Sequence, residues 1–131
     1  MAAADRDALE MAGLRFQVGI CEEALRADPE DTEALRFLAH AYTRMGRLDD
    51  GLTADRRLAA LCPADPRVRY NLACSCSLTG RAEEALAVLQ EAIGLGFDDL
   101  ALLRKDTDLD PLRADPRFRA LEVELEKKKG A

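Results

Sequence analysis

A repeat with a period of 34 residues is the feature that most constrains the fold of this 131-residue chain. The dipeptide at positions 38 and 39, Leu-Ala, recurs at positions 72 and 73. The same offset separates four further pairs of short segments: Gly46-Arg47 and Gly80-Arg81, Asp49-Asp50 and Glu83-Glu84, Leu52 and Leu86, and Pro29 and Pro63. Such a period is typical of a chain built from stacked supersecondary units, each of which buries its apolar face against its neighbours.

Each repeat contains the pattern of two helices. Apolar residues at a spacing of three to four predict a first helix over 32–45, with a buried stripe of Leu35, Leu38, Ala39, Tyr42 and Met45. Second helices are predicted over 48–61 and 82–93. Gly46 and Gly80 follow the first helices, where a left-handed residue closes the last turn. Asp31 and Asp65 precede the first helices of the two repeats, where a carboxylate caps the first turn. The small residues Ala39, Gly51, Ala73 and Ala85 let paired helices approach closely.

A small residue after leucine, a glycine in mid-repeat and a proline near the end of a 34-residue period resemble the tetratricopeptide repeat, or TPR. The resemblance implies an all-α TPR α-solenoid, in which antiparallel helix pairs form a right-handed superhelix. We therefore expect a single TPR domain over 1–131. Its parts would be an N-terminal capping helix in 1–31, one repeat in 32–65, a second in 66–97, and a C-terminal cap in 98–131.

The two ends of the chain depart from the repeat. A shift of 34 residues back from Leu38 reaches Ala4, where nothing matches, so a lone second helix is expected over 16–27, with frayed residues before Leu9. Residues 98–122 resemble a closing segment that follows many bacterial TPR arrays. There, the Asp-Pro pairs at 110–111 and 115–116 predict helix starts. Four apolar residues are expected to fold back over the last repeat: Leu112, Phe118, Leu121 and Leu125.

Catalysis, metal binding and cofactors find little support in the sequence. The chain has one histidine and contains neither a phosphate-binding glycine loop nor a nucleophile beside a plausible base, so we predict no enzyme and no catalytic residues. Cys74 and Cys76 lie two apart on a predicted helix and point in different directions, which argues against a shared metal ion. We therefore expect reduced thiols, no metal site and no cofactor. Three acidic residues imitate a calcium loop, but Pro111 stands where that loop needs glycine, so helix capping is the better interpretation of Asp106, Asp108 and Asp110.

Charge and hydropathy exclude other classes of partner. The net charge is −6, and residues 1–31 hold eight acidic residues against three arginines, so nonspecific nucleic-acid binding is disfavoured. The longest uncharged run has eleven residues, too few to span a bilayer, and the N-terminus lacks the apolar block of a secretory signal. These features predict a cytoplasmic protein that binds neither nucleic acid nor membrane.

The TPR resemblance implies a concave surface lined by one face of the first helices. On that face the sequence places eight candidate peptide-binding residues: Arg36, Phe37, His40, Arg44, Arg67, Tyr70, Asn71 and Cys74. Three of these residues are arginines, and they stand against a single acidic residue on the same face, Glu33. We therefore predict a locally basic groove with Phe37 and Tyr70 as its aromatic contacts. Some TPR proteins hold the terminal carboxylate of a peptide in a carboxylate clamp; Arg36 and Asn71 fall at two of its places.

These residues predict a monomeric, non-catalytic adaptor or assembly module that binds a protein or an acidic or mixed peptide of unidentified sequence. One alternative is a structural subunit that self-associates through a convex or edge surface. Another is a small enzyme or enzyme regulator. The arginines could also be merely solvated helix-face residues.

Overall fold

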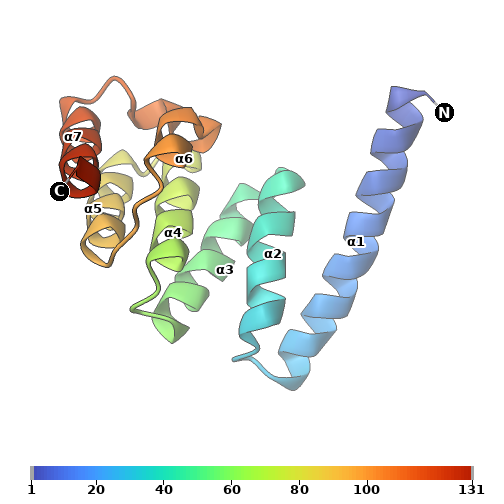
Figure 1. Ribbon diagram of the computed structural model, residues 1–131. Coiled ribbons are helices and arrows are strands. Elements are labelled where there is room, and N and C mark those ends of the chain that lie inside the picture. Colours follow the sequence, from blue (N-terminus) through green and yellow to red (C-terminus); the bar gives the residue numbers. More distant parts are fainter. Residues whose placement is uncertain (1, 131) are drawn as a thin grey trace. The chain divides into compact units, whose positions relative to one another are not determined.

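The computed structural model describes residues 2–130, which form helices and no strand (Figure 1). The all-α prediction is confirmed. The chain folds into two compact units, one that ends at Leu61 and one that begins at Cys62. The single domain predicted over 1–131 stays a prediction.

The first unit contains α1 (Ala3–Ala27), α2 (Thr32–Arg44) and α3 (Leu48–Leu61). Helices α2 and α3 pack as a pair, and α1 packs on α2. Val18 of α1 is buried there with Leu38, Ala41 and Tyr42 of α2. Helix α1 runs on to Ala3, so the prediction of fraying before Leu9 is wrong. The alanine-rich start favours helix, and Asp5 in the first turn interacts favourably with the helix dipole.

The turns of the first unit follow the predicted local chemistry. The carboxylate of Asp31 accepts a hydrogen bond from the Ala34 N–H at 3.0 Å, which caps α2. Gly46 has a φ of 78°, the left-handed conformation that ends the helix. Gly51 lies where α2 and α3 approach closely, because a Cβ atom there would lie 2.7 Å from Thr43 Oγ1.

The second unit contains α4 (Pro66–Leu78), α5 (Ala82–Gly94), α6 (Leu100–Lys105), the 3₁₀ helix η1 (Thr107–Leu112) and α7 (Pro116–Gly130). Helices α4 and α5 form the second predicted pair, η1 packs on α4, and α7 packs on α5. The closing segment buries its apolar residues as predicted, namely Leu112, Phe118, Leu121 and Leu125.

The two Asp-Pro pairs of the closing segment behave differently. Asp115 accepts a hydrogen bond from the N–H of Arg117, and α7 begins at Pro116, as predicted. The predicted helix start at Asp110 is wrong, because η1 begins earlier and Pro111 lies inside it. Asp106 supplies the cap, since its carboxylate accepts from the Asp108 N–H at 3.1 Å. This confirms helix capping for Asp106.

Candidate functional site

The exposed face of α2 carries polar residues opposite its buried stripe. Arg36, His40 and Arg44 are exposed, while Leu35 and Leu38 on the other side are each 1% exposed. An exposed face opposite a buried one follows from the helical period, because residues three and four apart share a face. The first unit therefore displays three of the predicted binding residues to solvent.

Two residues of α2 are engaged by α1. Phe37 is half-buried and packs against the apolar cluster that α1 and α2 share. Arg44 donates a hydrogen bond from Nη2 to Glu10 Oε1 at 2.6 Å, so its positive charge has an acidic neighbour. Part of the positive charge of Arg44 is therefore directed at α1.

On α4, two of the four predicted residues are exposed. Asn71 is solvent-accessible, and so is Arg67, whose guanidinium lies 5.7 Å from the centre of the Phe97 ring and 3.7 Å from Asp99. Both contacts come from the segment that follows α5. The exposed part of α4 is therefore confined to its first two turns.

The prediction that Tyr70 and Cys74 are open groove contacts is wrong, because the closing segment covers them. Tyr70 is 1% exposed, and its ring stacks on Phe97 at a centroid distance of 4.2 Å. Its hydroxyl donates to Asp106 Oδ2 at 2.6 Å. Cys74 Sγ lies 3.7 Å from the same oxygen, and Ser77 donates to the Asp108 carbonyl at 2.7 Å. The C-terminal cap thus lies on the α4 face where the sequence predicted a ligand.

Burial also changes the acid-base behaviour of this cluster. Removal from water raises the pKa of the Tyr70 hydroxyl and of the Cys74 thiol, and the carboxylate of Asp106 adds to both shifts. Because nucleophilic and metal-binding cysteines react as thiolates, a raised pKa keeps Cys74 protonated and inert.

Cys74, Asp106 and Asp108 each bring a potential metal-ligand atom within 4.8 Å of the others. The sequence did not predict this cluster, because the register of the repeat is lost between α4 and η1. The Asp106 oxygens already accept hydrogen bonds from the Tyr70 hydroxyl and the Asp108 N–H. These contacts account for the cluster as the link that holds η1 on α4.

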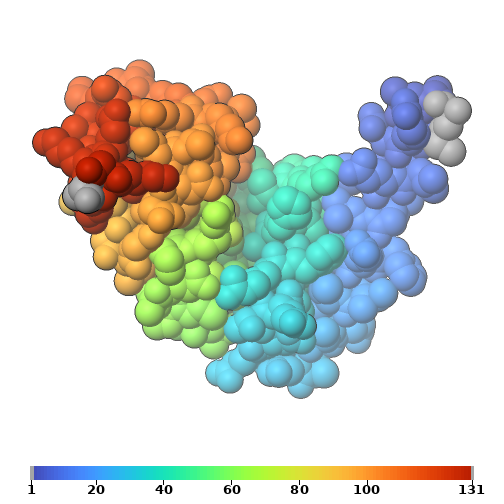
Figure 2. Space-filling model, in the orientation of Figure 1, coloured from blue at the N-terminus to red at the C-terminus, as the bar shows by residue number. Residues whose placement is uncertain are grey.

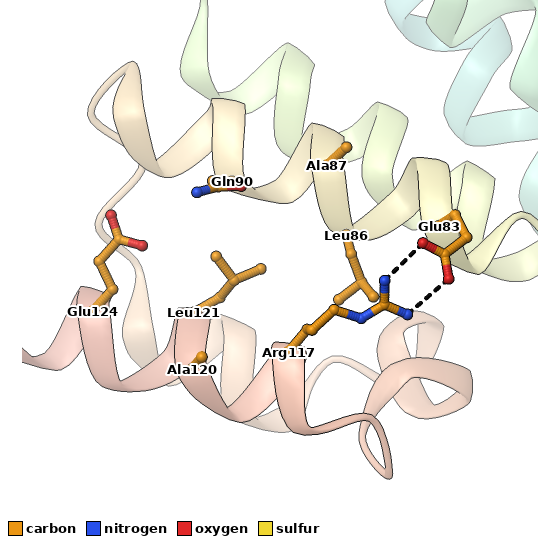
Figure 3. A pocket seen from close by; sticks show the side chains of 8 residues that line it. All are labelled: Glu83, Leu86, Ala87, Gln90, Arg117, Ala120, Leu121 and Glu124. Carbon is orange, nitrogen blue, oxygen red and sulfur yellow. Dashed lines mark hydrogen bonds and ion pairs between the residues drawn. The ribbon is translucent and has the colours of Figure 1, made fainter.

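A groove between α5 and α7, about 380 Å³ in volume, also lies in the second unit (Figure 3). Its floor is apolar and includes Leu86 and Leu121, which project toward each other from the two helices. At one end Arg117 reaches across from α7 and forms two hydrogen bonds with the Glu83 carboxylate, at 2.6 and 2.8 Å. Nothing in the repeat pattern indicates where α7 lies, so this groove could not be predicted from the sequence.

Arg117 also holds Asp115, with Nη2 2.7 Å from Asp115 Oδ2. The guanidinium lowers the pKa of Asp115 to about 2 and also lowers the pKa of Glu83. In turn, the two carboxylates raise the pKa of Arg117. The three side chains therefore form one charged link between α5 and α7.

Comparisons with known proteins agree with this architecture. The chain is 33% identical over 96 residues to Superkiller protein 3 of Schizosaccharomyces pombe, an alignment that covers 72% of this chain and 7% of that protein. The solved structure titled "MamA MSR-1 C2" matches with a TM-score of 0.68 at 18% identity, over 92% of this chain and 72% of that one. The fold is of the TPR type. No protein-family model matches the chain.

The match to Superkiller protein 3 spans a small part of that protein, so it bears on the repeat and not on the activity of the whole relative. Within residues 2–130, no helix has the length and apolar character needed to cross a membrane.

Proposed function

We propose that this protein is a non-catalytic adaptor that binds protein partners through two exposed helix faces, that of α2 in the first unit and that of α4 in the second. The observation that carries the proposal is the exposure of Arg36 and His40 on α2 and of Arg67 and Asn71 on α4, each opposite a buried face of its helix. The TPR-type fold supports it, because stacked helix pairs present extended binding surfaces.

The chemistry of these residues favours a ligand with carboxylates. Arginine recognises a carboxylate through two parallel hydrogen bonds, and an asparagine amide can donate a further one. We assign ligand contact to six residues of the predicted set: Arg36, Phe37, His40, Arg44, Arg67 and Asn71. Tyr70 and Cys74 leave the set because the closing segment buries them.

A defined peptide panel tests the proposal. Fluorescence anisotropy would measure the binding of peptides with acidic, mixed or basic C-terminal residues to the purified full chain. We expect acidic or mixed peptides to bind and Arg36→Glu to weaken them by at least about tenfold, because reversal replaces attraction by repulsion. Asn71→Ala tests α4 separately.

Lys127→Glu is the matched control, since it makes the same change of charge on the exposed end of α7. Unchanged affinity in Arg36→Glu and Asn71→Ala would contradict the proposal. Amide chemical-shift changes confined to helices other than α2 and α4 would also contradict it.

A further inference from the structure

Helix α1 has an apolar stripe that nothing in its unit covers. Leu9, Phe16 and Ile20 are 64%, 71% and 55% exposed. With Gly13, they follow one another in steps of four, three and four residues, so they lie on one side of the helix. The opposite side, which includes Val18, packs on α2. Helix α1 is therefore apolar on two faces and packed on one.

The first turns of α1 project beyond the rest of the first unit (Figure 2), and residues 2–10 are all exposed. Large apolar side chains gathered on an exposed face usually mark a contact surface. In the described part of the chain, Leu95 is the other large apolar side chain with comparable exposure, at 40%, and it lies after α5 instead of on this stripe.

We propose that the stripe binds the same stripe of a second copy, with the two α1 helices antiparallel. The steps of four, three and four read the same in both directions, so an antiparallel copy places Leu9 opposite Ile20 and Gly13 opposite Phe16. The largest side chain of the stripe, Phe16, then meets its smallest residue, Gly13, as the interdigitation of packed helices requires. A parallel copy would place Phe16 against Phe16 and leave a gap between the two Gly13 residues.

The surface around Gly13 has room for the incoming ring. A Cβ atom at Gly13 would have no neighbour within 4 Å. A hollow of about 470 Å³ lies beside it, bounded by α1 and by Arg44 of α2, and its lining includes Leu14 and Gln17. Phe16 of the second copy would enter this hollow, while each copy's own Phe16 forms part of the rim.

Charges at the ends of the stripe agree with the antiparallel arrangement. Asp5 and Arg26 lie on the same side of α1, near opposite ends. In this register, antiparallel pairing brings Asp5 of one copy within a turn of Arg26 of the other, which already pairs with Glu23 of its own copy, twice per dimer. Arg6 and Glu23 complete the end clusters, so each cluster has two acidic and two basic residues and no net charge.

Sedimentation equilibrium of the full chain measures its average mass at concentrations from about 1 μM to 1 mM. This range brackets the dissociation constants expected for an interface of small area. We expect a reversible dimer. Phe16→Glu should raise the dissociation constant at least about 100-fold, because two buried charges then face the four apolar side chains that remain in the interface. Leu95→Glu is the matched control and should leave the mass distribution unchanged.

A swap of large and small residues tests the pairing itself. Gly13→Leu and Phe16→Ala should each weaken the dimer, the first by steric overlap and the second by a lost contact. The double variant should restore it to within about tenfold of the wild type, because the leucine introduced at position 13 would then face the alanine introduced at position 16 of the other copy. Circular dichroism checks that each variant keeps its helix content.

A monomer at every concentration would overturn the proposal, and so would a dimer that Leu95→Glu disrupts and Phe16→Glu does not. A dimer strengthened by Gly13→Leu alone would overturn the antiparallel pairing. Arg44 borders this hollow and also belongs to the proposed peptide-binding set, whereas Arg36 does not line the hollow. Arg36→Glu therefore separates the two proposals, because it should weaken peptide binding and still dimerise like the wild type. Dimerisation would replace the monomer expected from the sequence.

Discussion

The two tyrosines each donate a hydrogen bond to a carboxylate on another element of their own unit. Tyr42 of α2 donates to Glu22 of α1 at 2.6 Å, and Tyr70 of α4 donates to Asp106, before η1, at 2.6 Å. Burial, with the hydrogen bond to Glu22, raises the pKa of Tyr42 to about 12. At the scale of single residues, these two hydroxyls hold the flanking segments onto the helix pairs.

Tyr70→Phe should lower the free energy of unfolding by about 1.5–3 kcal/mol, the usual contribution of a hydrogen bond to a charged group. The ring stack on Phe97 would remain, so the change isolates the hydroxyl. Urea denaturation followed by circular dichroism measures the loss. The control is Thr53→Ala, which removes an exposed hydroxyl and should cost less than about 0.5 kcal/mol. Equal stability of Tyr70→Phe and the wild type would contradict the assigned role.

The raised pKa of Tyr42 predicts that the stability of the fold changes with pH in the alkaline range. Its pKa is higher in the folded protein than the ordinary value near 10, so the hydrogen bond stabilises the fold fully below about pH 10. That contribution should disappear as the pH rises toward 12. Melting temperatures at pH 9 to 12 should therefore fall more steeply for the wild type than for Tyr42→Phe. Parallel curves for the two proteins would count against this linkage.

The ion pairs of Arg117 predict that the stability of the fold changes with pH in the acidic range. The pKa values of Asp115 and Glu83 are lower in the folded protein than in free side chains, so the charged link between α5 and α7 stabilises the fold above about pH 4. Its contribution should be lost as the pH falls toward 2. Carbon NMR titration of the Asp115 carboxyl should give a midpoint near 2, and Arg117→Gln should move it upward. A midpoint near 4 in the wild type would rule out the link in solution.

At the scale of elements, close approach of the paired helices depends on small residues. Gly51 of α3 faces Thr43 of α2, whose hydroxyl donates to the Ala39 carbonyl at 3.0 Å. A methyl group at position 51 would overlap Thr43 Oγ1 at 2.7 Å. Alanine has the higher helix propensity, by about 1 kcal/mol, so the helix itself would favour it and the contact opposes it.

Gly51→Ala should therefore lower the free energy of unfolding by about 1 kcal/mol, since Thr43 must turn away and lose its hydrogen bond. In a Thr43→Ala background the same change should be neutral or stabilising by up to about 1 kcal/mol. Urea denaturation of the four proteins of this double-mutant cycle measures the coupling. An identical effect in both backgrounds would show that the contact does not limit the approach of the helices.

At the scale of the whole molecule, the four cysteines report on both units. Cys21 of the first unit and Cys62 of the second are half-buried, whereas Cys74 and Cys76 of the second unit are buried. Burial of a thiol both blocks reagents and, for Cys74, raises the pKa. Thiol reactivity therefore measures how often the second unit opens.

A disulfide reagent at pH 8 should modify Cys21 and Cys62 first, and Cys74 and Cys76 at least about 100-fold more slowly, at the rate allowed by opening. Leu112→Ala should accelerate only the slow pair, because removal of a buried leucine from η1 costs about 2–5 kcal/mol. Mass spectrometry of the labelled peptides identifies each thiol, and Cys21 serves as the internal reference. Four equally fast thiols in the wild type would contradict the burial of this face of α4.

The sequence by itself determined the helix pairs and their turns. The predicted boundaries of 32–45, 48–61 and 82–93 lie within one residue of the observed helices, and both mid-repeat glycines have positive φ. The prediction of helix boundaries and turns succeeds because helical periodicity, caps and left-handed glycines depend on residues within a turn or two of one another.

Only the tertiary structure decided which faces remain open. The sequence predicted correctly that the closing segment buries its apolar residues, and it did not reveal that Phe97 and Asp106 cover Tyr70 and Cys74. The contact that decides this joins residues 36 positions apart, beyond the segment where the repeat loses its register. A local pattern tells which side of a helix is apolar, and the packing of distant segments determines whether a polar or aromatic side chain meets solvent, a ligand or the chain itself.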